Sequence, residues 1–312
     1  MKILITGVHG FVGSNQVKAL KDRHEIYGLD IVAPERDGVV RTFSWDAVEN
    51  NTLPQVDAII HLAGKAHDTS GKDPADAYFK INTGLTVKIY DWFLNHPETG
   101  CFIFFSTVKA ACGKLSDRVL TEEVIPAPVG PYGESKIKAE EYILAHPATD
   151  RKVIILRPCM IHGPGNKGNL NLLYKLVSTG MPWPLSRFDN RRTFTSVDNL
   201  SFVIDGLLTR PVESGIYHMA DDEALSTNRL VELICRATGR PCRRMGLPAG
   251  MVRCLCRVGD ALHLPVNSFR LDKLTENYVV SNAKIKKALG MDRMPVRAED
   301  GILKTIRSFN VR

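Results

Sequence analysis

The feature that most constrains the fold of this chain is a glycine-rich turn close to its N-terminus. A short apolar run, Ile3-Leu4-Ile5, is typical of a buried parallel strand, and a helical pattern follows the turn. Between them lie Gly7, Gly10 and Gly13. Glycines at such points let the backbone turn sharply and approach a pyrophosphate, which rests on the N-terminus of the helix. A strand, a glycine-rich turn and a helix in this order predict a dinucleotide-binding α/β domain.

An acidic residue, Asp30, ends the second predicted strand. A carboxylate at this distance beyond the glycines accepts a hydrogen bond from the adenosine ribose 2′-hydroxyl and repels a 2′-phosphate, which favours NAD over NADP. Arg36 and Arg41 lie in the next loop and weaken that preference, so NADP stays an alternative. Asp46, further along, is a candidate for the adenine edge; its other interpretation is a loop or N-cap aspartate.

A third buried strand over 56–64 ends at Leu62, Ala63 and Gly64, where small residues permit close approach of a flat cofactor. His61, inside this apolar strand, is interpreted as a core histidine with satisfied hydrogen bonds rather than a ligand. Residues 76–94 read as a helix that contains Asn82. Asparagine is a poor helix-interior residue, so Asn82 is expected to serve a hydrogen-bonding purpose.

Polar residues follow two further apolar strands. The strand 101–105 releases Ser106 and Thr107 at its carboxyl end, and the strand 153–156 is followed closely by Pro158. Ligands in open α/β sheets bind at that edge, so a hydroxyl there can polarise a substrate oxygen. The alternative is a strand-end residue that caps its own backbone.

A candidate acid/base pair opens a later helix. Pro131 suits the first helical position, and Tyr132 and Lys136 lie four residues apart on one face. A nearby ammonium and the positive end of the helix both favour the phenolate. Tyr132 is therefore predicted to accept or donate a proton near neutral pH.

Two later elements are predicted with their caps. Residues 190–197 alternate like a strand, and Asp198 is expected to be the N-cap of the helix that follows. Ser226 and Thr227 are expected to start an amphipathic helix.

Charge and cysteine content narrow the class of partner. The formal net charge is +7, which suits a phosphate-bearing small molecule, whereas no run of consecutive Lys and Arg predicts nucleic acid binding. Seven cysteines without paired spacing predict reduced thiols in a cytoplasmic protein, and Cys254 and Cys256 are expected to pack rather than bind a metal. No metal site is expected.

Nothing in the sequence predicts stable membrane insertion. The N-terminal apolar run is too short for a signal peptide, and no run approaches a membrane-spanning length. Residues 251–264 carry Arg253 and Arg257 beside apolar residues. This pattern allows a membrane-surface helix, but it is interpreted as a partly buried helix of a second lobe.

Together these motifs resemble the extended short-chain dehydrogenase/reductase superfamily, and within it the NAD-dependent epimerase/dehydratase family that acts on nucleotide sugars. The likeness spans nearly the whole chain. The residues that carry it, in order, are Gly7/Gly10/Gly13, Asp30, His61-Leu62-Ala63-Gly64, Ser106-Thr107, Tyr132 with Lys136, and Arg157-Pro158.

The resemblance implies a Rossmann-type, doubly wound parallel sheet with a smaller, mostly helical C-terminal substrate lobe. The NAD(P)-binding domain would span 1–165 with a returning segment at about 193–222, and the nucleotide-sugar lobe would span 166–192 and 223–312. Relatives commonly dimerise through the helix that carries the tyrosine and its neighbour, which implies a homodimer.

The resemblance also implies roles for single residues. Tyr132 would be the acid/base, Lys136 would bind the nicotinamide ribose, and Thr107 would supply the catalytic hydroxyl beside the sugar. Asn169 and Arg192 would contact the nucleotide diphosphate, with Arg191 as the alternative to Arg192. Ser106 would join them at the substrate, and the cofactor would also contact Gly7, Gly10, Phe11, Val12, Gly13, Asp30, Asp46, Leu62, Ala63, Gly64, Asn82 and Pro158.

The chain departs from the family pattern after the strand 101–105. Ala111-Cys112-Gly113 stands where relatives carry a second tyrosine, and counting back from Gly113 puts Val108 at the hydroxyl position. Counting forward from the strand gives Thr107, which is preferred because valine cannot donate a hydrogen bond. Sugar-nucleotide 4,6-dehydratases follow their threonine with Asp-Glu, and Val108-Lys109 here excludes dehydration. Met160 stands near the position where some 4-epimerases keep an asparagine, which leaves the identity of the sugar open.

Three functions follow from the resemblance. The first is a 4-epimerase of a UDP-hexose or UDP-N-acetylhexosamine that works through a 4-keto sugar. The second is a 4-keto-reductase of a UDP-4-keto-6-deoxy-N-acetylhexosamine in bacterial surface polysaccharide synthesis. The third is a non-catalytic NAD-binding regulator; such proteins typically lose the tyrosine or lysine, which this chain retains.

Overall fold

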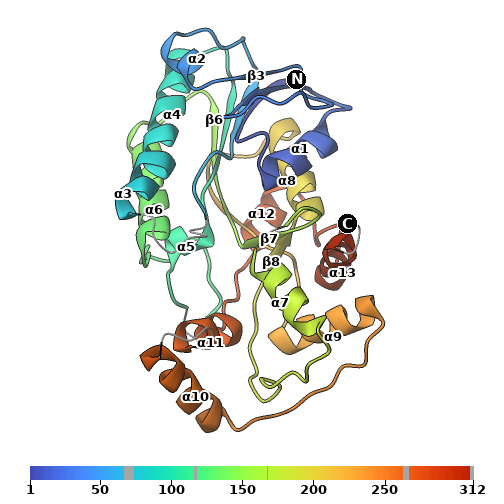
Figure 1. Cartoon of the computed structure of the whole chain (residues 1–312). Coiled ribbons are helices and arrows are strands. Elements are labelled where there is room, and N and C mark those ends of the chain that lie inside the picture. Colours follow the sequence, from blue (N-terminus) through green and yellow to red (C-terminus); the bar gives the residue numbers. More distant parts are fainter. Residues whose placement is uncertain (67–73, 116–117, 167, 263–266, 310–312) are drawn as a thin grey trace.

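The computed structural model describes residues 1–66, 74–115, 118–166, 168–262 and 267–309. Its central feature is a seven-stranded parallel sheet in the order β3-β2-β1-β4-β5-β6-β9 (Figure 1). The strands are β1 (Lys2–Thr6), β2 (Glu25–Leu29), β3 (Arg41–Phe43), β4 (Ala58–His61), β5 (Cys101–Phe105), β6 (Lys152–Pro158) and β9 (Gly215–Met219).

The central strands β4 and β5 are buried along their whole length because both faces of the sheet are covered by helices. Successive side chains point to opposite faces, so Ile3 and Ile5 lie in one core while Leu4 lies in the other. The first face is covered by α1 (Phe11–Leu20), α8 (Val197–Thr209) and α12 (Ala283–Ala288), and the second by α2 (Asp46–Glu49), α4 (Leu85–Asn95) and α6 (Pro131–Ala145) (Figure 1). This arrangement confirms the predicted α/β, doubly wound fold.

The helix predicted over 76–94 is continuous but changes its winding. It begins as α3 (Ala75–Tyr78), widens into a π-helical segment, η1 (Phe79–Gly84), and continues as α4. Asn82 lies in the π-helical segment. Such wide turns are frequent at functional sites. A short helix, α5 (Val108–Ala111), follows β5, and Pro131 occupies the first position of α6 as predicted.

A smaller part lies below the sheet in Figure 1 and has its own apolar core. It is built around the two-stranded parallel pair β7 (Met160–His162) and β8 (Phe194–Ser196). Its helices are α7 (Asn169–Val177), α9 (Thr227–Thr238), α10 (Ala249–Ala261), α11 (Ser268–Thr275) and α13 (Ala298–Phe309). Ile285 of α12, by contrast, packs in the core of the large sheet.

Two local predictions are wrong in detail. The strand predicted over 190–197 is regular only over Phe194–Ser196, because Arg192 pairs singly with Leu225 and Tyr278. The N-cap of α8 is Ser196, whose hydroxyl accepts from the Asn199 amide, while Asp198 lies inside the first turn. The start of α9 at Thr227, capped by Ser226, is confirmed.

Candidate active site

The glycine-rich turn after β1 forms a cradle that has no room for side chains. Gly7 has φ +68°, and a Cβ on Gly13 would lie 2.3 Å from the Gly7 carbonyl oxygen. A Cβ on Gly10 would lie 3.1 Å from the same oxygen. The close backbone approach between the turn and α1, with Phe11 and Val12 at the start of the helix, is the geometry that a pyrophosphate group requires.

Asp30 lies at the carboxyl end of β2, against this turn. Its carboxylate accepts hydrogen bonds from the backbone amides of His9 at 2.9 Å and Ile31 at 2.8 Å. These contacts hold the carboxylate beside the glycine-rich turn. Asp46 is exposed at the first position of α2, where its carboxylate accepts from the Ser44 hydroxyl at 3.4 Å.

The end of β4 is fixed to β1 through one hydroxyl. Thr6 Oγ1 accepts from the amides of Leu62 and Ala63 and also bonds to His61 Nδ1 at 2.7 Å. His61 Nε2 bonds to Thr86 Oγ1 at 2.9 Å, and burial holds the pKa of the imidazole well below its ordinary value. His61 is therefore the core histidine that was predicted.

Asn82 serves the hydrogen-bonding purpose expected of it. Its amide nitrogen donates to the Lys65 carbonyl at 3.1 Å and to the Ser135 hydroxyl at 2.9 Å, and its oxygen accepts from the Lys65 amide at 2.7 Å. A Cβ on Gly64 would lie 2.9 Å from that oxygen and 3.2 Å from Lys136 Nζ. Asn82 thus ties the loop after β4 to the helix that carries Tyr132.

Tyr132, Thr107 and Lys136 meet at the carboxyl edge of β5. The Thr107 side chain lies close enough to the Tyr132 hydroxyl to lower the pKa of the phenol, and Lys136 Nζ donates to the Phe105 carbonyl at 2.7 Å. Thr107 also caps α5 by accepting from the Lys109 amide at 3.2 Å. The contact with Tyr132 supports Thr107, rather than Val108, as the hydroxyl residue.

The electrostatics of this cluster differ from the sequence prediction. Burial raises the pKa of Tyr132 above its ordinary value, and the Thr107 hydrogen bond opposes that rise. Burial also lowers the pKa of Lys136 to about 8, which Glu140 partly offsets. The reason is desolvation: a partly buried phenol and a buried ammonium both favour their neutral forms.

Ser106 and Pro158 lie on the same edge with different surroundings. The Ser106 hydroxyl donates to the buried carboxylate of Glu140, which also binds the guanidinium of Arg157. This directs Ser106 into the layer beneath α6, away from the Thr107 hydroxyl. Pro158 ends β6 opposite Met219 of β9.

The predicted substrate residues come from the smaller part of the molecule. Asn169 is exposed at the first position of α7. Arg192 is half-buried, and its Nη1 donates to the Lys273 carbonyl at 2.7 Å. Arg191 is exposed, and its backbone amide donates to Asn277 Oδ1 at 2.8 Å. The half-buried position favours Arg192 over Arg191 as a ligand of a fixed anion.

Three residues at this junction were not predicted. Lys109 Nζ pairs with Glu276 at 3.0 Å and lies 3.8 Å from the centre of the Tyr278 ring. The Tyr278 hydroxyl donates to the carbonyl oxygens of Val108 at 3.0 Å and Cys112 at 2.5 Å. These contacts join α5, which follows Thr107, to the chain beyond α11. No local sequence pattern predicts these contacts, since the residues that they join are separated by 166 to 170 positions.

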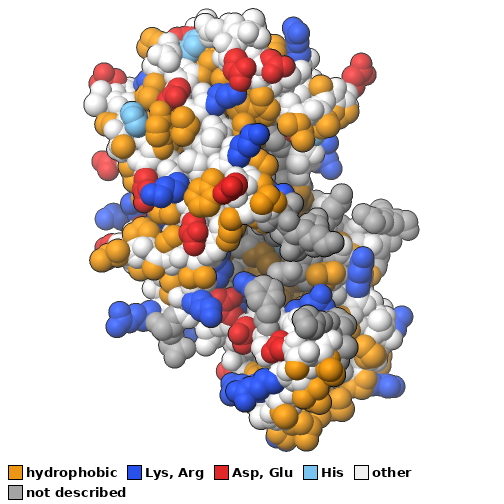
Figure 2. All heavy atoms as spheres, turned by 60° about the vertical axis from the view of Figure 1, so that its left-hand side comes forward, with side chains coloured by type: hydrophobic (Ala, Val, Ile, Leu, Met, Phe, Trp, Pro, Cys, Tyr) orange, Lys and Arg blue, Asp and Glu red, His pale blue; other side chains and the backbone are white. Residues whose placement is uncertain are grey.

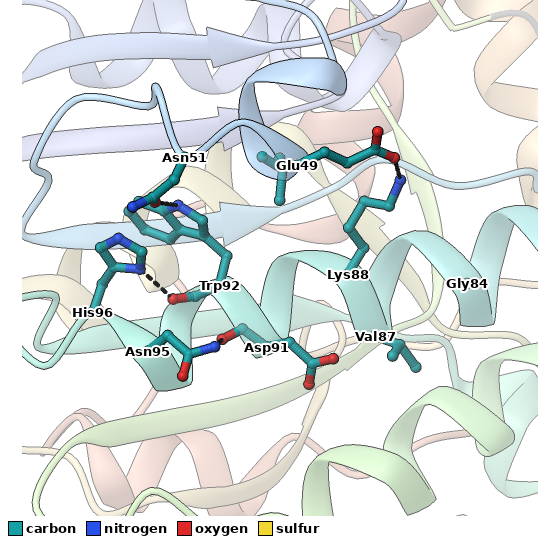
Figure 3. A pocket seen from close by; sticks show the side chains of 10 residues that line it. Glu49, Asn51, Gly84, Val87, Lys88, Asp91, Trp92, Asn95 and His96 are labelled. Carbon is teal, nitrogen blue, oxygen red and sulfur yellow. Dashed lines mark hydrogen bonds and ion pairs between the residues drawn. The ribbon is translucent and has the colours of Figure 1, made fainter.

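A hollow of about 650 Å³ lies elsewhere, between α2 and the outer face of α4 (Figure 3). Lys88 reaches across it to Glu49, and the Trp92 indole donates to Asn51. None of the predicted site residues lines this hollow.

Comparison with known proteins decides the family. Residues 3–220 match the NAD dependent epimerase/dehydratase family. The chain belongs to this family. The match confirms the predicted family and, with it, the prediction of an enzyme that uses NAD(P).

Individual relatives agree with the family match. The chain is 28% identical over 323 residues to a UDP-glucose 4-epimerase of Vibrio cholerae, covering 98% of this chain and 95% of that protein. It is 28% identical over 244 residues to a GDP-6-deoxy-D-talose 4-dehydrogenase of Aggregatibacter actinomycetemcomitans, covering 75% and 79%. Among solved structures, the Thermus thermophilus UDP-glucose 4-epimerase complex with NAD has a TM-score of 0.76 at 22% identity and covers 99% of both chains.

Proposed function

We propose that this protein is an NAD-dependent 4-epimerase of a UDP-hexose or UDP-N-acetylhexosamine. The observation that carries the proposal is the placement of the Thr107 side chain beside the Tyr132 hydroxyl at the carboxyl edge of β5, with Lys136 four residues along the same helix. The similarity to a UDP-glucose 4-epimerase over nearly its whole length supports the choice of reaction.

In this proposal the residues of the chain bind, orient and move one proton. Bound NAD would supply the reversible hydride chemistry at C4, so that the sugar passes through a 4-keto form. Tyr132 takes the proton of the 4-hydroxyl and later gives it back. Thr107 orients the oxygen at C4, and Lys136 supplies positive charge at the nicotinamide ribose. Arg192 pairs with the nucleotide diphosphate.

The choice of NAD follows from Asp30, whose carboxylate is fixed beside the glycine-rich turn. A fixed negative charge there repels a 2′-phosphate. The proposal also includes a homodimer formed through α4 and α6, a cytoplasmic location and a role in surface polysaccharide synthesis.

The test is to incubate the protein with UDP-glucose or UDP-N-acetylglucosamine and catalytic NAD, and to follow C4 inversion by proton NMR. We expect interconversion without net change in NADH, and loss of at least about a hundredfold in turnover for Tyr132→Phe. An unchanged rate in Tyr132→Phe, or no turnover of any UDP-hexose, would refute the proposal.

A 4-keto-reductase is the second candidate, and the similarity to a GDP-6-deoxy-D-talose 4-dehydrogenase favours it. The same residues would act once, with Tyr132 as proton donor to the 4-keto oxygen. Stoichiometric loss of NADH absorbance with a 4-keto nucleotide sugar would identify this reaction.

A further inference from the structure

Helix α10 has two separate apolar faces, and only one of them is covered. Val252, Cys256 and Gly259 are buried against the smaller part of the molecule, which confirms the predicted partly buried helix. Packing in the core therefore explains why the residues of this face are apolar, but it does not explain the apolar residues elsewhere on the helix. A second row lies beside it, made of three residues of α10 and its C-cap, at 52%, 55%, 49% and 63% exposure: Met251, Leu255, Val258 and Leu262.

We call this second row the α10 stripe. Its members follow one another at intervals of four, three and four positions, which places them along one line of a helix with 3.6 residues per turn. Single exposed apolar residues are common, but four in register on one helix form a contiguous surface that signals a partner.

The chain that leads to α10 is strongly basic, and two of its arginines lie on the helix itself. Arg253 and Arg257 occupy the remaining side of α10 together with Asp260. Between Glu232 and Asp260 the sequence has no acidic residue, and it has six exposed arginines: Arg236, Arg240, Arg243, Arg244, Arg253 and Arg257. Arg244 pairs with Glu232, which leaves five of these cations without that neutralisation. At the lower end of Figure 2, where α10 lies, hydrophobic side chains gather with basic ones beside them.

We infer that α10 docks this enzyme on the surface of an anionic lipid bilayer, with the α10 stripe inserted at the level of the acyl chains and the arginines at the phosphates. An apolar face with arginines on the polar face of the same helix is the pattern of a helix that lies in the membrane interface. Long arginine side chains let their apolar stems follow the helix into the interface while the charged ends stay at the phosphates.

Two other occupants fit the observations less well. Among the residues that the structure describes, no helix has the length and apolarity to cross a bilayer, and the 13 residues of α10 span only about 20 Å. A second copy of the chain packed stripe to stripe would cover the apolar row, but it would leave Arg253 and Arg257, on the other side of α10, with only Asp260 to offset them. An anionic surface satisfies both the apolar row and the positive charge.

The test is sedimentation of the purified full chain with vesicles of phosphatidylcholine alone or mixed with phosphatidylglycerol. We expect binding to the mixed vesicles that weakens with added salt. Val258→Glu should reduce this binding at least about tenfold, because it places a carboxylate inside the stripe. Val40→Glu is the matched control: Val40 is 60% exposed and precedes β3, at the opposite end of the molecule, so binding should be unchanged.

Charge variants test the second half of the inference. Arg253→Gln and Arg257→Gln should each weaken binding to the mixed vesicles about fivefold, whereas replacement of both arginines by lysine should preserve it. Circular dichroism and melting temperature establish that each variant is folded.

Two results would overturn the inference: no vesicle binding by the unaltered protein, or equal vesicle binding by Val258→Glu and the unaltered protein. In the second case the molecular mass of Val258→Glu in solution is also measured, and it could be half that of the unaltered protein. A halved mass would identify the α10 stripe as a contact between copies. Vesicle binding is measured without substrate, so it is independent of the proposed reaction.

Discussion

At the scale of single residues, the acidity of Tyr132 is set by opposing effects of its surroundings. Burial raises the pKa of its hydroxyl, and the Thr107 hydrogen bond works in the other direction. Lys136, expected to be the main acidifying group, directs its ammonium to the Phe105 carbonyl. Thr107 is therefore the side chain that most directly favours the phenolate in the protein without ligands.

Replacement of Thr107 tests this balance. In Thr107→Val the pKa of Tyr132, the proposed proton acceptor, should move upward, because the Thr107 side chain that lowers it has lost its hydroxyl. The kcat/KM value should fall about a hundredfold. Thr107→Ser keeps the hydroxyl and should retain most of the activity. The measurement is the pH profile of kcat/KM for both variants; matching profiles would contradict a role for the hydroxyl.

The buried ammonium of Lys136 predicts a pH-dependent stability. Its pKa is lowered from 10.5 to about 8, so between these values the unfolded chain holds a proton that the folded protein has released. The free energy of unfolding should therefore rise with pH above 8, by up to about 1.4 kcal/mol per unit. Urea unfolding of nucleotide-free protein between pH 8 and 10 measures this slope.

Lys136→Met should lack this contribution to the slope. Lys138→Met, a change at an exposed position of the same helix, should keep it. If the two variants and the unaltered protein have parallel profiles, the ammonium of Lys136 is not desolvated in the way that the fold implies.

At the scale of helices and strands, local patterns predict much of the candidate site. The turn at Gly7, Gly10 and Gly13, the strand ends at Gly64 and Thr107, and the helix that begins at Pro131 all depend on neighbours in sequence. The parallel topology then brings these ends to one edge.

Contacts between distant segments could not be predicted in the same way. Ser106 faces Glu140 because of how α6 packs on the sheet, and Lys109 meets Glu276 only once the two parts of the molecule are assembled. The N-cap of α8 could not be predicted from the sequence for a similar reason. Ser196 and Asp198 are both suitable N-cap residues, and Ser196 takes the position because β8 ends there.

Tyr278→Phe tests how far the smaller part of the molecule orders α5. Loss of a hydroxyl that donates to two carbonyls should lower the free energy of unfolding by about 1–2 kcal/mol and speed hydrogen exchange of the α5 amides. Tyr90→Phe removes a similar donor, to the His146 carbonyl, and should leave α5 exchange unchanged. Equal exchange in both variants would show that α5 is ordered without Tyr278.

At the scale of the whole molecule, the two parts are joined where the proposed substrate residues lie. Arg192 bonds to the Lys273 carbonyl, Lys109 pairs with Glu276, and Thr193 and Tyr278 are joined through the backbone. A ligand bound at this junction would contact the edge of the large sheet and the smaller part together. It would therefore stabilise the chain as one unit.

Binding of the cofactor should accordingly stabilise the entire protein, and Asp30 should decide which cofactor does so. A ligand that binds only the folded state, at a hundred times its Kd, adds about 2.7 kcal/mol to the free energy of unfolding. NAD should therefore raise the melting temperature by several degrees, and NADP at the same concentration by much less, since the Asp30 carboxylate opposes a 2′-phosphate.

In Asp30→Ala the melting-temperature shifts caused by NAD and by NADP should become similar. Asp22→Ala removes the same charge from an exposed turn and should preserve the difference, so that a general effect of net charge is distinguished from a local one. An Asp30→Ala protein that still prefers NAD as strongly as the unaltered chain would mean that another group near the glycine-rich turn sets the choice.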